Sequence, residues 1–186
     1  MKASACQLQE MIFKETQFES VYIVELEKHA DSRGFFARTW CRNEFEAHGL
    51  NTQLLQSNIA FSKARGTLRG LHYQAEPYAE VKLIRCLKGS VYDVIVDLRP
   101  ESVTYKHWLA TELTGDDYKM IYVPEGFAHG YQTLEENSEI FYQVSQIYAP
   151  EFERGIRFND PAFMIQWPDD IRIISDKDMN WKDYLS

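Results

Sequence analysis

Cysteine is scarce in this chain, and the three cysteines present form no pattern. Cys6, Cys41 and Cys86 are widely separated, odd in number and never spaced as CxxC. Disulfide-dependent secreted domains carry many cysteines in even numbers, and structural zinc sites need closely spaced ligand pairs. The sequence therefore predicts free thiols or small buried side chains in a reducing cytoplasm, without a disulfide framework.

Long apolar runs and a basic charge balance are also missing. No hydrophobic stretch is long enough to cross a bilayer, and the N-terminus lacks the sections of a signal peptide. The formal net charge is −8, whereas binding to a phosphate backbone normally needs a basic surface. We therefore expect neither a membrane nor a nucleic acid as partner. A small anionic ligand stays possible, because it responds to local charge.

No internal repeat, low-complexity tract or Pro/Gly/Ser linker divides the 186 residues. That length suits one domain with a full core. We expect a short N-terminal extension over residues 1–10 and a single domain over residues 11–186. The glycine-rich patterns GxGxxG and GxxxxGK[ST] are absent, which disfavours dinucleotide-binding and P-loop folds.

Alternating apolar and polar residues predict many short strands. The candidate segments are residues 21–26, 81–88, 91–99, 107–113, 119–123, 130–134 and 138–147. Gly89-Ser90 has the spacing of a two-residue hairpin turn, and residues 41–49 predict one short helix that stops at Gly49. Short strands with frequent turns and few helices predict an all-β fold, an antiparallel sandwich or barrel.

Residues 67–74, TLRGLHYQ, carry the densest chemistry in the chain. His72 can act as a base near neutral pH or bind a metal. Arg69 can grip a phosphate through its planar guanidinium, and Gly70 lets a backbone or a ligand approach closely. These residues suit a site that binds an anionic substrate and moves a proton.

Two strands place a polar residue among apolar ones. Lys82 shares a face with Ile84 and Cys86, and Tyr142 shares a face with apolar neighbours. Lys82 is either an exposed edge lysine or a cation aimed at an enolate or a phosphate. Tyr142 is either an ordinary core tyrosine or an inward-pointing functional group.

Residues 124–130, PEGFAHG, contain the pattern P-x-G-x-x-H, which is typical of cupin barrels and often supplies a metal-binding histidine, here His129. The companion metal motif of cupins begins H-x-H, but this chain reads His72-Tyr73-Gln74, and the nearest acid, Glu80, falls later than that motif expects. Two histidines alone make a poor transition-metal site. We therefore favour a cupin-type jelly-roll β-barrel (double-stranded β-helix) with a few short peripheral helices and without a catalytic metal.

These segments together resemble the dTDP-4-dehydrorhamnose 3,5-epimerase family, a cupin-fold group that acts on nucleotide-linked 4-keto-6-deoxy sugars. The resemblance covers nearly the whole chain, from about Met11 to Asp178, and also includes Tyr142 and Tyr148. The matching segments are residues 31–36 (DSRGFF), 56–58 (QSN), 68–74 (LRGLHYQ), 82–83 (KL), 91–99 (VYDVIVDLR), 102–105 (SVTY), 124–130 (PEGFAHG), 159–161 (NDP), 167–168 (WP) and 175–178 (SDKD). Their order and spacing make the likeness specific.

The resemblance implies a role for each matching residue. His72 corresponds to the general base, Asp178 to its paired carboxylate, Tyr142 to the proton donor and Lys82 to the cation near the 4-keto oxygen. The implied substrate contacts are Arg33, Gln56, Asn58, Arg69, His129, Tyr148, Glu153 and Lys177. One position departs from the pattern: Arg38 stands where familiar members carry a glutamate that contacts the nucleotide.

The implied reaction is epimerisation at C3 and C5 of a dTDP-linked 4-keto-6-deoxyhexose, without a metal or redox cofactor. The family also implies a homodimer in which the Arg33 region reaches the neighbouring site. Three alternatives stay open: an epimerase acting at C3 or C5 alone on another nucleotide sugar, a metal-dependent cupin enzyme using His72 and His129, and a non-catalytic sugar-nucleotide-binding module.

Overall fold

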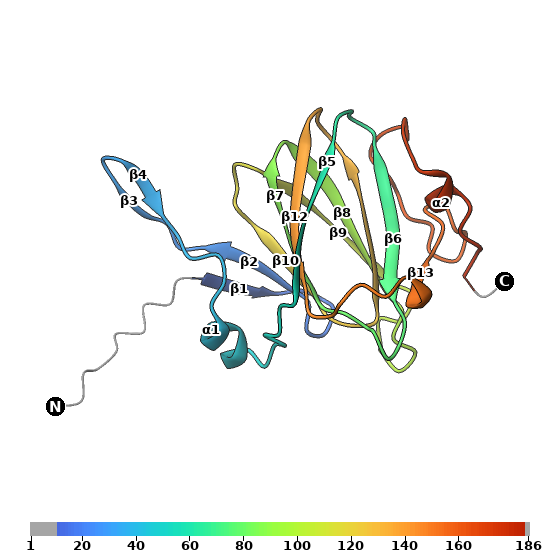
Figure 1. Cartoon of the computed structure of the whole chain (residues 1–186), viewed down its shortest axis with the longest axis horizontal. Coiled ribbons are helices and arrows are strands. Elements are labelled where there is room, and N and C mark those ends of the chain that lie inside the picture. The colour runs from blue at the N-terminus through green and yellow to red at the C-terminus, as the bar shows by residue number, and fades with distance from the viewer. Residues whose placement is uncertain (1–10, 185–186) are drawn as a thin grey trace.

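A computed structural model describes residues 11–184, and the expected extension at residues 1–10, with Cys6, lies outside them. The described chain forms two antiparallel sheets packed face to face, which confirms the predicted all-β fold (Figure 1). The first sheet has the order β1 (Met11–Glu15), β2 (Tyr22–Leu26), β10 (Met120–Val123), β7 (Lys82–Lys88), β12 (Ser138–Val144) and β5 (Gln56–Ser62). The second has the order β13 (Glu153–Gly155), β6 (Leu68–Gln74), β11 (Phe127–Thr133), β8 (Ser90–Asp97) and β9 (Trp108–Thr114).

The remaining elements lie at the periphery of the two sheets. They are the hairpin β3 (His29–Asp31) and β4 (Gly34–Phe36), the helices α1 (Arg42–Ala47) and α2 (Asp176–Met179), and the 3₁₀ turn η1 (Pro150–Phe152). The predicted helix is confirmed, and Gly49 follows it in a left-handed conformation at φ +70°. The sequence pattern gave no signal for the β3–β4 hairpin, which stands away from the sandwich in Figure 1. No helix within residues 11–184 is long and apolar enough to span a bilayer.

Side-chain alternation builds one central core and two outer ones. Between the sheets pack apolar residues from β7, β8, β9, β10, β11 and β12, among them Ile84, Ile95 and Ile140. Helix α1 covers part of the first sheet through Phe45, which packs with Leu83 and Tyr122. The C-terminal segment covers the second sheet. Strand β8 is therefore buried on both faces, and its apolar residues are shared between two cores.

The hairpin predicted at Gly89-Ser90 is wrong. Strand β7 pairs with β10 and β12, whereas β8 pairs with β11 and β9, so the two consecutive strands belong to different sheets. Gly89 turns the corner at φ +74°, and a Cβ there would lie 2.5 Å from Ser138 Oγ. A short connection can join two paired strands or cross between two packed sheets. Its spacing alone does not distinguish these outcomes.

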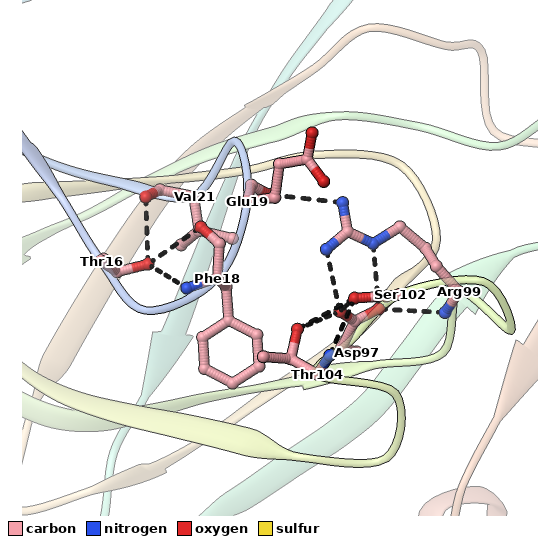
Figure 2. A network of polar contacts seen from close by, with 8 residues as sticks. All are labelled: Thr16, Phe18, Glu19, Val21, Asp97, Arg99, Ser102 and Thr104. Carbon is pink, nitrogen blue, oxygen red and sulfur yellow. Dashed lines mark hydrogen bonds and ion pairs between the residues drawn. The ribbon is translucent and has the colours of Figure 1, made fainter.

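A buried carboxylate fastens the loop after β8 (Figure 2). Asp97 accepts hydrogen bonds from Arg99 at 2.8 and 2.9 Å, from Ser102 at 2.6 Å and from Thr104 at 2.7 Å. Arg99 also donates to the carbonyl of Glu19 in the β1–β2 turn. Burial alone would raise the pKa of Asp97, but these donors together lower it to about 2. The network joins the two sheets at this edge.

We predict that Asp97→Asn lowers the free energy of unfolding by about 2 kcal/mol at neutral pH, because the folded pKa lies below the ordinary value of 3.8. A depressed carboxylate pKa stabilises the fold above the unfolded pKa. The stabilisation is lost as pH falls from about 4 toward 2. Urea unfolding of both proteins across this pH range measures the difference.

The matched control for this prediction is Glu101→Gln in the same loop, where the side chain is exposed. It removes one negative charge without touching the network, so its unfolding midpoint should stay near that of the unsubstituted protein. An Asp97→Asn variant as stable as this control at neutral pH would contradict the prediction.

Candidate active site

A cavity of about 710 Å³ opens between the sheets, at the end where β7 begins and β12 ends. Strands β5, β7 and β12 line one wall, while β6, β11 and β13 line the other. The segment from Ile173 to Asp178, which leads into α2, contributes a third side. The central core fills the rest of the space between the sheets, so the cavity is the unfilled end of the same interior.

Most of the site residues expected from the sequence meet in this cavity. Those that line it are Gln56, Asn58, Arg69, His72, Lys82, His129, Tyr142, Tyr148, Glu153, Lys177 and Asp178. Arg33 and Arg38 do not line the cavity of their own chain. The Arg33 side chain is 87% exposed on the projecting hairpin and pairs with Asp31, and Arg38 pairs with Glu44.

His72 and Asp178 form the central pair of the site, although 106 residues separate them. His72 Nε2 lies 2.5 Å from Asp178 Oδ1, and the backbone N–H of Gly70 donates to Asp178 Oδ2 at 3.2 Å. Ser175 caps α2 by accepting a hydrogen bond from the N–H of Asp178. Backbone geometry and a helix cap thus hold the carboxylate against the imidazole.

The charge state of Asp178 sets the tautomer of His72. Burial alone would raise the pKa of Asp178, but the hydrogen bond and charge of His72, the Gly70 N–H and Ser175 together hold it below its usual range. An ionised carboxylate can only accept hydrogen bonds. Nε2 of His72 is therefore protonated in the neutral ring, and Nδ1 keeps the free lone pair of a base.

Two glycines set the spacing between β6 and β11 beside this pair. Gly70 has φ +116°, and a Cβ there would lie 2.5 Å from the Cα of Gly130. A Cβ on Gly130 would lie 2.7 Å from the carbonyl oxygen of Arg69. Both positions therefore require glycine if the two strands are to approach this closely. The same approach aims the Gly70 N–H at Asp178.

Lys82 lies on a central strand, so its reading as an exposed edge residue is wrong. Its side chain is only 10% exposed, and its Nζ donates to Glu80 Oε1 at 2.6 Å. A buried ammonium needs such a partner, because an isolated buried charge is costly. The pair places a fixed positive charge on the wall formed by the first sheet.

Tyr142 points into the cavity from the adjacent strand, β12. No hydrogen bond to its hydroxyl occurs within the described residues, so it does not bond a backbone carbonyl as a core tyrosine would. Burial raises the pKa of Tyr142, and the nearby carboxylate of Glu80 raises it further. The group is therefore a protonated phenol with a free hydroxyl near neutral pH.

A second cluster surrounds Tyr148, whose ring is half-exposed at the cavity. Its hydroxyl donates to Glu153 Oε2 at 2.7 Å, and Lys177 Nζ donates to the same oxygen at 2.6 Å. Burial would raise the pKa of Glu153, but Lys177 and Tyr148 hold it below its usual range. The ring offers a surface for stacking, and the backbone N–H of Tyr148 donates to Gln56.

Three groups near the site were not predicted as functional residues. Asp93 pairs with His129 at 2.8 Å from strand β8, Tyr131 lines the cavity from β11, and Glu80 pairs with Lys82. Glu80 lies two residues before Lys82, so strand alternation offered a signal for it. Asp93 carried no such signal, because the pairing of β8 with β11 is long-range.

The two histidines do not form the metal site of the alternative reading. His72 bonds Asp178 and His129 bonds Asp93, each through Nε2. Within residues 11–184, no group of three or more His, Cys, Asp or Glu side chains has the arrangement to hold a metal ion. The donor set therefore does not fit a resident transition metal.

Known proteins resemble this chain over nearly its whole length. A family model described as dTDP-4-dehydrorhamnose 3,5-epimerase matches residues 15–185. An enzyme of that name from Shigella flexneri is 39% identical, over 91% of this chain and 94% of its own. A solved dTDP-4-dehydrorhamnose 3,5-epimerase from Elizabethkingia anophelis superposes with a TM-score of 0.91 at 37% identity, over 94% of this chain and 97% of its own.

Two further solved structures carry a sugar nucleotide. A dTDP-6-deoxy-D-glucose-3,5-epimerase from Legionella pneumophila, in complex with dTDP-4-keto-L-rhamnose, has a TM-score of 0.86 at 34% identity, over 93% of this chain and 92% of its own. A 3′-monoepimerase from Streptomyces bikiniensis, in complex with dTDP-quinovose, has a TM-score of 0.83 at 31% identity, over 90% of this chain and 85% of its own. The fold, the match to the family model and the residues of the cavity all point to the same family. The chain belongs to the dTDP-4-dehydrorhamnose 3,5-epimerase family.

Proposed function

We propose that this protein inverts C3 and C5 of a dTDP-linked 4-keto-6-deoxyhexose, of the dTDP-4-dehydro-6-deoxyglucose type, without a cofactor. One observation carries the proposal: a base on one wall of the cavity faces a phenol and a cation on the other. His72 stands on β6 of the second sheet, whereas Tyr142 and Lys82 stand on β12 and β7 of the first. Inversion of a carbon requires this division of proton donor and acceptor.

The first step uses the ketone at C4 of the sugar. Protons on C3 and C5 are acidic because both carbons flank that carbonyl. Nδ1 of His72 takes one of these protons, and the electron pair of the C–H bond moves into an enolate. Asp178 orients the ring and stabilises the imidazolium that forms.

The second step returns a proton from the opposite wall. Lys82 faces the developing negative charge on the C4 oxygen and stabilises it electrostatically. Tyr142 then donates its hydroxyl proton to the carbon, which restores the ketone with inverted configuration. The phenolate regains a proton from water entering the cavity, and the imidazolium of His72 gives its proton up to water, so both residues return to their starting states. The same residues serve C3 and C5 in turn if the sugar ring adjusts between steps.

The cluster around Tyr148 provides a place for the nucleotide. We propose that the half-exposed ring stacks on the base and that Lys177 and Arg69 bind the pyrophosphate. Arg69 is positioned for this by hydrogen bonds to Ser62 Oγ at 3.2 Å and to the carbonyl of Phe61 at 3.1 Å. Gln56 and Asn58 contact the ligand from β5, and His129, held by Asp93, contacts it from β11.

We predict that His72→Asn slows turnover by about 10²–10⁴-fold while the affinity for dTDP stays within about threefold, because the variant loses the base but keeps the nucleotide contacts. Deuterium incorporation at C3 and C5 in heavy water, followed by NMR, measures turnover. Calorimetry with dTDP measures binding.

Each outcome of this experiment separates the candidate functions. Exchange at one carbon only would identify a monoepimerase. No exchange by the unsubstituted protein with any nucleotide-linked 4-keto sugar would contradict the proposal and favour a binding module. Activity that disappears with a chelator and returns with a metal would favour the metal-dependent alternative.

Tyr142→Phe should separate exchange from inversion. His72 can still remove a proton and, being one-third exposed, trade it with solvent before returning it to the same face. We predict that deuterium still enters the substrate, whereas inverted product falls by about 10²–10⁴-fold. NMR of the recovered sugar measures both quantities in one sample. Equal losses of exchange and inversion would contradict the assignment of Tyr142 as proton donor.

We propose that the enzyme works as a homodimer in the cytoplasm. Residues Gln56, Asn58 and Ala60 of β5 line the cavity, so Ile59 and Phe61 face outward, and they are 62% and 51% exposed. Ile59 lies beside Phe141 of the adjacent strand β12. An exposed apolar face of this kind suits a second copy of the chain. The free thiols of Cys41 and Cys86 support the location.

We predict that Ile59→Glu converts the dimer to a monomer, because it buries a charge in the proposed interface. Sedimentation measures the mass, and Val103→Glu, on a side chain that is 98% exposed, is the control that stays dimeric. If the hairpin reaches across, Arg33→Ala should lower the activity of the partner's site. Mixing Arg33→Ala and His72→Asn chains should then restore activity, since a mixed dimer contains one intact site. A dimeric Ile59→Glu variant would contradict the interface, and failed restoration would contradict the shared site.

A further inference from the structure

Glu80 is a charged residue in the cavity that the proposed mechanism does not use. It lies in the connection between β6 and β7, and its side chain is 11% exposed. One carboxylate oxygen accepts a hydrogen bond from Lys82 Nζ at 2.6 Å, and the other accepts one from Gln74 Nε2 at 3.2 Å. Both oxygens are therefore held, and the carboxylate links the two sheets.

Gln74 is itself fixed by the backbone around it. Its Nε2 also lies within hydrogen-bonding distance of the carbonyls of Tyr78 at 3.0 Å and Ile147 at 3.3 Å, so its two hydrogens are shared among three acceptors, and its Oε1 accepts from the N–H of Ala149 at 2.6 Å. The residue is 4% exposed and lies at the end of β6. A rigid amide thus anchors Glu80, and Glu80 in turn anchors the ammonium of Lys82.

We propose that Glu80 is a positioning residue of the epimerase, which fixes the Lys82 ammonium at the cavity wall and places a negative charge beside the Tyr142 hydroxyl. This inference rests on the proposed function and assigns a residue that does not itself act on the sugar. Lysine has a long, flexible side chain, and without a partner its ammonium would sample many positions. A fixed ammonium meets the enolate oxygen without reorganising.

The charge of Glu80 also acts on the proton donor. Burial is the main cause of the raised pKa of Tyr142, and Glu80 is the largest charge effect in the same direction. The groups electrostatically coupled to Tyr142 are Arg69, Glu80, Tyr131, Tyr148 and Glu153. The other charged and titratable groups that line the cavity with it are His72, Tyr73, Lys82, His129, Lys177 and Asp178. A donor must be protonated at the working pH, so a carboxylate beside the phenol preserves its function at higher pH.

Removing the charge of Glu80 has two consequences with the same sign. The phenol loses a neighbouring anion, and the ammonium of Lys82 is no longer neutralised by its partner. Both changes favour the phenolate over the phenol. Glu80→Gln should therefore lose its proton donor at lower pH than the unsubstituted enzyme, in addition to losing the fixed position of Lys82.

The test compares Glu80→Gln, Glu80→Asp and the exposed neighbour Glu76→Gln as a control in the full chain. With a dTDP-4-keto-6-deoxy sugar as substrate, we expect Glu80→Gln to lower kcat about ten- to hundredfold with KM changed less than about threefold. In the pH profile of kcat, the loss of activity at alkaline pH should also begin at a lower pH than in the unsubstituted enzyme. Glu80→Asp keeps the negative charge on a shorter side chain. Its kcat should therefore fall in part, while the pH at which activity is lost on the alkaline side should stay unchanged. Glu76→Gln should change neither.

A second readout does not depend on turnover. The phenolate absorbance of Tyr142, obtained as the difference from a Tyr142→Phe background, should appear at lower pH when Glu80 is replaced by Gln. An unchanged phenolate titration together with unchanged kcat would overturn the inference, as would a loss of thermal stability that alone accounts for the lost activity. Absence of turnover in the unsubstituted protein would count against the proposed function, while the titration would still decide the effect of Glu80 on Tyr142.

Discussion

The inner faces of the two sheets have to be apolar along most of their length and polar at one end. The same face of β7 carries Lys82 at its start and then Ile84 and Cys86, and the same face of β12 carries Ile140 before Tyr142. Each apolar side chain buried there contributes about 1.5–3 kcal/mol. The core that stabilises the sandwich therefore ends directly beneath the polar cavity and gives its walls a rigid base.

That arrangement forces each buried charged side chain at the cavity to have a partner. Lys82 pairs with Glu80, only two residues away, whereas the pairs His72–Asp178 and His129–Asp93 join segments that are distant in sequence. A buried charge left without its partner costs about 3–5 kcal/mol. Stability and preorganisation thus have the same origin, because the contacts that make these charges tolerable also hold them where a reacting sugar would need them.

Local patterns predicted much of this structure and failed where long-range pairing decides. Alternation located most strands and put Lys82 and Tyr142 on faces shared with apolar residues, but it left open whether Lys82 was exposed at an edge. It could not tell that the turn at Gly89 joins two different sheets, because a tight turn has the same composition in either case. The pairing of His72 with Asp178 rested on resemblance to a family, since the 105 intervening residues carry no local signal. Glu80 had a detectable signal, its spacing from Lys82, but a carboxylate near a strand end is usually solvated.

The contact between Gly70 and Gly130 limits how this protein can change over generations. Two strands that carry a proposed base and its neighbouring histidine touch through backbone alone, so no side chain at either position can be accommodated by adjusting the other. Most surface positions of a protein tolerate random substitutions, but these two glycines do not. New substrate preferences in descendants of this chain must therefore arise from the walls around the contact, while the distance between β6 and β11 is inherited unchanged.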